Sequence, residues 1–117
     1  MNDVHEEAQR QLNAVRRDFE VRLGDMIEDI VCAWEAARSA PDLARLRKLT
    51  ELLHSLSGNA GFFRLQEVSG TASALEQMVD RWVDSGTINK VAIIEMNRLM
   101  QILRACAAPC DGKGKGR

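Results

Sequence analysis

The chain has 117 residues, of which 45% are hydrophobic and 28% are charged, a composition typical of a single soluble globular domain. The formal net charge of -1 offers no general attraction for nucleic acid or an anionic membrane, and no apolar run is long enough to cross a bilayer. The three cysteines lack a CxxC spacing, so neither a disulfide framework nor a metal site is indicated. We therefore expect a cytoplasmic protein that binds neither nucleic acid nor membrane.

The first third of the chain has apolar residues at intervals of three or four, which predicts a helix with one buried face over residues 3–37. The residues of this face are Leu12, Val15, Phe19, Leu23, Met26, Ile30 and Trp34. Gly24 interrupts the pattern, since glycine weakens a helix interior. Residues 3–37 are expected to form either one long helix or two pieces joined near Gly24.

A second helix is expected after "SAPD" (residues 39–42), with Ser39 as its N-cap and Pro41 in its first turn. Its apolar face consists of Leu46, Leu49, Leu53, Leu56 and Ala60. Glycine is frequent where helices stop, so this helix should end near Gly61.

Two more helices complete the pattern. The third begins near Leu65 and stops at Gly86, and its apolar face consists of Val68, Ala72, Leu75, Val79 and Trp82. The fourth should be capped by Thr87 and be over by Pro109, and its face consists of Ala92, Met96, Leu99, Leu103 and Cys106. Residues 1–107 are thus one helical domain, and residues 108–117 are predicted to be a flexible basic tail.

The fold class follows from these faces. No stretch shows the sustained alternation of a strand, and four amphipathic helices joined by short turns can bury their apolar faces only against one another. The sequence therefore predicts an all-α protein built as an antiparallel four-helix bundle.

His54 is the main candidate for chemistry. An ideal helix turns about 100° per residue, which places His54 roughly 120° from the apolar face of its helix and so in solvent. Gly58 follows one turn later, where a glycine costs roughly 1 kcal/mol relative to alanine. One reading is that the missing side chain lets another protein approach the imidazole. The other is that His54 is an ordinary surface residue and that Gly58 and Gly61 only help to end the helix.

The segment "HSLSGNAGFFRLQEVSGTASALE" resembles the signature of the histidine-containing phosphotransfer (HPt) domain. The matching residues are His54, Leu56, Gly58, Ala60, the turn from Gly61 to Phe63, Leu65, Ala72, Leu75 and Glu76. Nearly the whole chain up to Ala107 can be aligned with the architecture of such domains. The resemblance implies a four-helix bundle with an additional N-terminal helix, and a phosphorylatable His54 on the second bundle helix.

The function implied by this resemblance is phosphotransfer within a two-component phosphorelay. His54 would accept a phosphoryl group on Nε2 from a receiver-domain phosphoaspartate or a hybrid kinase and pass it to another receiver. The implied partners are response-regulator receiver domains and a sensor or hybrid histidine kinase. The receiver would supply Mg²⁺ and a lysine, so the chain needs no cofactor of its own. Without a Walker A sequence or a nucleotide-binding glycine box, the protein should be a phosphoryl carrier and not a kinase.

The residues around His54 receive supporting roles in this reading. Ser57 stands where many members of the family have lysine; its hydroxyl can donate a hydrogen bond to a phosphoryl oxygen but supplies no charge. Cationic substitutes could be Arg47, Lys48 and Arg64. Gly58 would provide clearance and Gly61 a turn.

Docking of a partner is assigned to Phe62, Phe63, Lys48 and Glu51. For the two phenylalanines, packing into the core at the turn is the alternative to an exposed apolar rim. The polar group that orients His54 Nδ1 could come from the N-terminal helix, with Gln9, Gln11 and Asn13 as candidates.

Two competing readings remain. The first is a helical binding module that docks receivers or helices without carrying phosphate, and Ser57 in place of lysine favours it. The second is a dimer formed through the apolar face of the N-terminal helix. A monomeric phosphotransfer protein is the expectation on balance.

Overall fold

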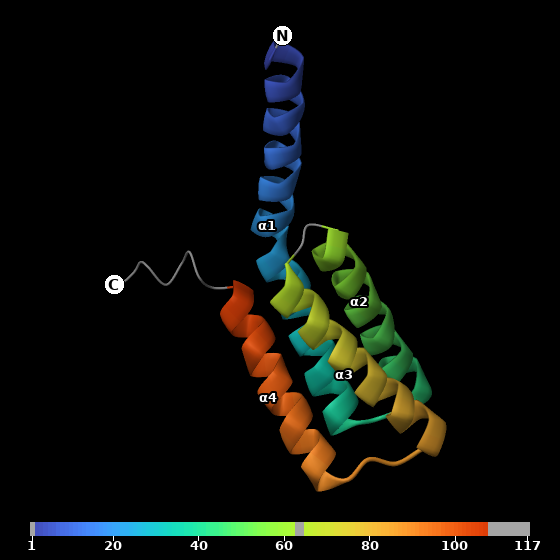
Figure 1. The fold of residues 1–117 in the computed structure, drawn as a ribbon. Helices are drawn as coiled ribbons and strands as arrows, with labels where there is room; N and C mark the ends of the chain where they lie inside the picture. Colours follow the sequence, from blue (N-terminus) through green and yellow to red (C-terminus); the bar gives the residue numbers. More distant parts are fainter. Residues whose placement is uncertain (1, 63–64, 108–117) are drawn as a thin grey trace, which may run out of the picture.

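The computed structural model describes residues 2–62 and 65–107. These residues form α1 (Asn2–Ser39), α2 (Leu43–Phe62), α3 (Gln66–Ser85) and α4 (Lys90–Ala107), with no strand among them. Successive helices run in opposite directions, as Figure 1 shows, and α1 and α3 each pack against both α2 and α4. The prediction of an all-α four-helix bundle is confirmed. The predicted tail, residues 108–117, lies outside the described residues.

The N-terminal region is one continuous helix, so of the two arrangements expected around Gly24 the single helix is the one observed. The additional N-terminal helix is not seen as a separate element in the described part of the chain, because residues 2 onward already belong to α1. At about 1.5 Å per residue, the 38 residues of α1 span about 57 Å, whereas the 20 residues of α2 span about 30 Å. The first turns of α1 therefore extend past the end of the bundle (Figure 1).

The core follows the predicted apolar faces of the helices. α2 buries all five predicted residues, from Leu46 to Ala60, and α3 buries its five, from Val68 to Trp82. On α1 the buried positions begin only at Phe19, and the predicted core residues Leu12 and Val15 are about half exposed, at 51% and 52%. They are exposed because no other described helix reaches that far along α1.

Two helix caps differ from the sequence prediction. The backbone N–H of Arg45 donates to Asp42 Oδ1 at 2.8 Å, so Asp42 is the N-cap of α2, and the assignment of this cap to Ser39 is wrong. Ser39 ends α1, and a cap must directly precede the first helical residue to reach its free N–H groups.

The cap of α4 is Asn89 and not Thr87, since the backbone N–H of Ala92 donates to Asn89 Oδ1 at 2.8 Å. Gly86 does end α3 as predicted, in the left-handed conformation with φ of 79°. None of the helices in the described residues has the length and apolarity that a membrane span requires.

Candidate functional site

His54 lies on the outer face of α2, as the helical geometry predicted. Its side chain is 78% exposed, although the adjacent Leu53 and the nearby Leu56 are completely buried. α2 thus holds the imidazole in solvent while the leucine side chains on either side of it in the sequence fix the helix to the core.

Glu76, on the neighbouring helix α3, holds the imidazole. Its Oε2 lies 3.0 Å from His54 Nδ1, and its side chain is only 21% exposed. A carboxylate oxygen accepts hydrogen bonds, so this contact favours the tautomer with the proton on Nδ1, which leaves the lone pair on Nε2. The pair therefore exposes Nε2 as the nucleophilic atom.

The sequence-based candidates for this orienting role were wrong. Gln9, Gln11 and Asn13 are exposed in the first turns of α1, where Gln9 donates to Asn13 and Gln11 donates to Glu7. A signal for Glu76 was present, because a hairpin between α2 and α3 brings residues at similar distances from the turn side by side. His54 lies eight residues before the end of α2 and Glu76 lies ten residues after the start of α3, a difference of about half a helical turn that the Glu76 side chain bridges.

Ser57 and Ser69 link α2 to α3 beside the histidine. The Ser57 hydroxyl donates to the backbone carbonyl of Ser69 at 3.3 Å, and the Ser69 hydroxyl donates to the backbone carbonyl of Ser57 at 3.0 Å. A hydroxyl has a single proton, so Ser57 would have to leave Ser69 in order to donate to a phosphoryl group. The predicted phosphoryl contact of Ser57 stays a prediction.

The two glycines after His54 both lie within α2. Gly58 is exposed, and a Cβ atom added there would meet nothing within 4 Å, so packing within the fold does not require glycine. Gly61 lies in the last turn of α2 and not in the connecting turn where it was expected. A Cβ at Gly61 would lie 3.4 Å from Ser69 Oγ.

The predicted charged residues divide between two faces of α2. Arg47 and Glu51 are exposed two turns and one turn before His54, within about 60° of it around the helix. Lys48 is turned away from them, since it lines a hollow together with Asp29 and Cys32 of α1. Lys48 is therefore not brought together with His54.

The predicted apolar rim is represented in the described residues by Phe62, whose residue surface is 73% exposed. Packing of Phe62 in the core, the alternative considered above, is therefore not what the structure shows. Phe63 and Arg64 lie outside the described residues.

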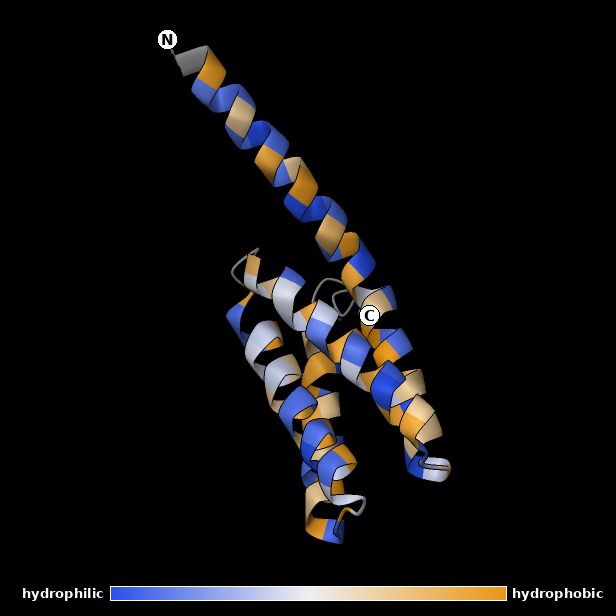
Figure 2. Cartoon of the chain, turned by 90° about the vertical axis from the view of Figure 1, so that its right-hand side faces the viewer, coloured by the Kyte–Doolittle hydropathy of each residue, from blue (hydrophilic) through white to orange (hydrophobic). Residues whose placement is uncertain are grey.

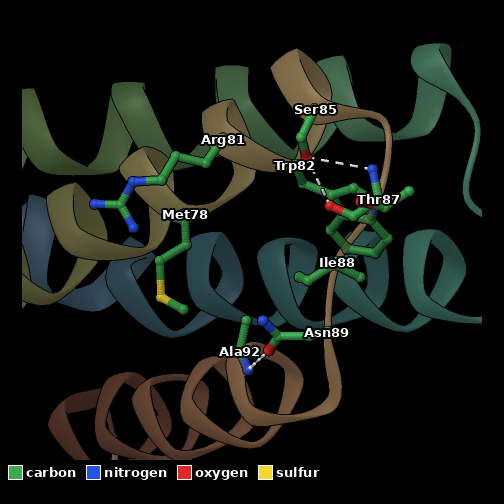
Figure 3. A pocket seen from close by; sticks show the side chains of 8 residues that line it. All are labelled: Met78, Arg81, Trp82, Ser85, Thr87, Ile88, Asn89 and Ala92. Atoms are coloured by element: carbon green, nitrogen blue, oxygen red, sulfur yellow. Dashed lines mark hydrogen bonds between the residues drawn. The ribbon is translucent and has the colours of Figure 1, made fainter.

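A separate hollow lies where α3 connects to α4, with a lining that extends from Met78 of α3 to Ala92 of α4 (Figure 3). Two of its polar side chains bond within the chain: the Ser85 hydroxyl donates to the Thr87 carbonyl at 2.8 Å, and Asn89 caps α4. The described residues contain no group of three or more potential metal-ligating side chains. This hollow offers no reactive group comparable with His54.

The described cysteines are both free thiols. Burial and the neighbouring Glu67 carboxylate raise the pKa of the Cys106 thiol, which lowers its thiolate fraction at neutral pH. Cys106 is therefore a poor candidate for a nucleophile.

The fold and the site together define a class of protein: a helical bundle with an oriented, exposed imidazole on its surface. The sequence profile of the Hpt domain family matches residues 3–106, almost the whole chain. The chain belongs to the Hpt domain family, which supports a histidine phosphotransfer role in a phosphorelay and interaction with receiver domains and kinases. No significant match to a curated protein or to a solved structure was found.

Proposed function

We propose that His54 is the phosphorylated residue of a phosphorelay protein that takes a phosphoryl group from a receiver phosphoaspartate, or from a hybrid kinase, and passes it to a second receiver. The observation that carries this proposal is the geometry of one side chain. The His54 ring is 78% exposed while its Nδ1 is held 3.0 Å from Glu76 Oε2, so Nε2 points to the approaching partner.

The transfer step uses these two atoms of the ring differently. The Nε2 lone pair forms the N–P bond as the bond between phosphorus and the aspartyl oxygen breaks, and the electrons of that bond return to the receiver's carboxylate. The ring becomes positively charged, with its proton still on Nδ1. The Glu76 carboxylate accepts a stronger, charge-assisted hydrogen bond from that ring, which stabilises phosphohistidine. Transfer to a second receiver reverses these changes.

Access to Nε2 depends on the surface around it. Gly58 leaves open space one turn after His54, so a receiver can bring its phosphorylated aspartate close to the ring. Glu51 and Phe62 are exposed on α2 and would contact the receiver around the reacting atoms. Arg47 would supply positive charge in place of the lysine that Ser57 replaces.

The remaining components belong to the partner in this proposal. The receiver supplies Mg²⁺ and a lysine to neutralise the phosphoryl oxygens, since in-line transfer depends on positioning and on charge neutralisation. The chain then acts as a phosphoryl carrier without autokinase activity or a cofactor of its own.

The test is transfer from receivers of the same organism, each first phosphorylated with a labelled small phosphodonor. We expect an acid-labile, alkali-stable label on the wild-type chain and on a His5→Gln control, and none on His54→Gln. The control changes the only other histidine of the chain. Label retained on His54→Gln would refute the assignment, and binding of receivers without any label would support the non-phosphorylated binding module.

A further inference from the structure

The first turns of α1 expose an apolar surface. We call residues 4–18 the α1 projection, because every one of them is exposed and Phe19 is the first buried residue of the helix. Val4, Leu12 and Val15 are the large apolar residues of the projection, with 81%, 51% and 52% of their surface exposed. Figure 2 shows apolar residues recurring in orange along this part of α1, well past the bundle.

The exposed apolar residues continue the core face of α1. At about 100° per residue, Val4, Leu12 and Val15 all lie within about 60° of Phe19 around the helix. Ala8 falls on the same face. From Phe19 onward this face packs into the bundle. The apolar face of the projection thus continues the face that α1 buries in the core, but no described helix packs against it. Amphipathic helices owe most of their stability to packing of such a face.

We infer that the α1 projection pairs with the projection of a second copy of this chain, in the antiparallel direction. The direction follows from the bundle itself. A parallel partner helix lying on this face would continue past Phe19 into the space that α2 and α4 of the first copy already fill. An antiparallel partner helix has its N-terminus near Phe19 of the first copy, so it does not enter that space. The bundle of the partner then lies beyond the N-terminus of the first copy.

The length of the projection sets the register. If each tip reaches the end of the other bundle, the two-fold axis passes near residue 10, and a residue n of one copy lies opposite about residue 20 − n of the other. Ala8 then faces Leu12 of the second copy, and His5 faces Val15. The Ala8–Leu12 pair sets a small side chain against a large one, an arrangement that packs well.

The charges favour the same arrangement. Residues 4–10 carry Glu6, Glu7 and Arg10, a net charge of -1 with histidine neutral, and residues 11–18 carry Arg16, Arg17 and Asp18, a net charge of +1. Antiparallel pairing brings the acidic half of each copy to the basic half of the other, whereas parallel pairing brings like charges together. Near the two-fold axis, Gln9 lies beside the apolar face. Its neutral amide can hydrogen-bond to Gln9 of the second copy.

The paired length is short, about 25 Å of helix per copy, so we expect a reversible dimer at the small end of stable interfaces. Sedimentation velocity of the full chain over about a hundredfold dilution should show the mass of two chains falling to that of one. Val15→Glu should give a single chain throughout. Val21→Glu is the matched control, because Val21 is 76% exposed on the opposite side of α1, and it should dimerise like the wild type. Circular dichroism checks that both variants keep the bundle.

A wild-type chain that sediments as one copy at the highest concentration would overturn the proposal, as would equal effects of Val15→Glu and Val21→Glu. Dimerisation only after a phosphorylated receiver is added would also overturn it, because the projection would then serve the receiver complex. His54→Gln should dimerise normally, which separates this proposal from the proposed phosphotransfer.

Disulfide trapping tests the direction. In chains whose three native cysteines are replaced by serine, a mixture of His5→Cys and Val15→Cys should form mainly mixed disulfides under mild oxidation. Disulfides between two His5→Cys chains would indicate a parallel pair and would refute the antiparallel arrangement.

Discussion

Two exposed surfaces of the molecule differ in the polarity of their side chains. One is the surface of α2 and α3 around His54, and the other is the α1 projection. The His54 surface consists mainly of small, polar and charged residues, with Phe62 as its large apolar residue, and cross-helix hydrogen bonds that involve Glu76, Ser57 and Ser69 order it. The projection displays large apolar side chains in phase with the core. A phosphoryl carrier must release each partner after transfer, and an interface with little apolar area allows this release. Self-association of two helices in water depends on buried apolar area. The two surfaces should therefore serve separate functions, transfer and self-association.

The variant Gly58→Gln should have the largest effect on transfer without affecting self-association, and so it tests whether the two surfaces act separately. A Cβ at this position meets nothing, and leaving glycine should stabilise the helix by about 0.5–1 kcal/mol, while the longer side chain stands beside the imidazole. We expect the transfer rate to fall about hundredfold, because small displacements of reacting groups cost that much, with the sedimenting mass unchanged.

The matched control is Gly24→Gln, since a Cβ at Gly24 in α1 also meets nothing within 4 Å and the residue lies far along the chain from the site. Transfer rates measured beside urea unfolding curves distinguish the explanations. If Gly58→Gln lost transfer only in proportion to a loss of folded protein, the access argument would be wrong.

A smaller effect is expected at Glu76. Glu76→Ala removes the acceptor of the Nδ1–H bond, and the loss of one charge-assisted hydrogen bond of about 1.5 kcal/mol corresponds to about a tenfold slower transfer. Glu76→Gln keeps an acceptor oxygen but not the charge, so its rate should lie between those of wild type and Glu76→Ala. The measurement is the initial rate of labelling from one phosphorylated receiver, together with the lifetime of the phosphohistidine.

Equal rates for all three proteins would mean that the ring needs no orienting carboxylate. Self-association should not respond to either Glu76 variant, because Glu76 lies between α2 and α3, away from the projection. A change in sedimenting mass would show that the two surfaces are coupled.

The features that could be predicted from the sequence depend on residues close together in the chain. The apolar faces of α2 and α3, the left-handed stop at Gly86 and the outward direction of His54 all follow from helical periodicity or local backbone chemistry. The resemblance of the segment from His54 to Glu76 to the HPt signature agrees with the family match.

The features that the sequence did not predict depend on how the helices pack against one another and on local backbone geometry. Periodicity shows which face of α1 is apolar, but it cannot show that Leu12 and Val15 extend past the helices that would cover them. The partner of His54 Nδ1 depends on the axial position of α3 relative to α2, and the spacing of residues along one helix does not determine it. The two caps were missed because several capping residues stand close together before α2 and α4, and backbone geometry selects Asp42 and Asn89 among them.

The smallest predicted effect concerns the reciprocal serine link beside His54. Ser57→Ala and Ser69→Ala each remove one hydroxyl-to-carbonyl bond and should each lower the free energy of unfolding by about 1 kcal/mol, measured by urea denaturation. Ser69→Ala is the matched control, because its bond is the mirror of the one that Ser57 makes. Since the Ser57 proton is engaged by Ser69, we expect the two variants to transfer phosphate at the same rate under conditions where both are folded. Slower transfer by Ser57→Ala alone would instead show that this hydroxyl turns to the phosphoryl group during the reaction, and the His54 surface would then rearrange on partner binding.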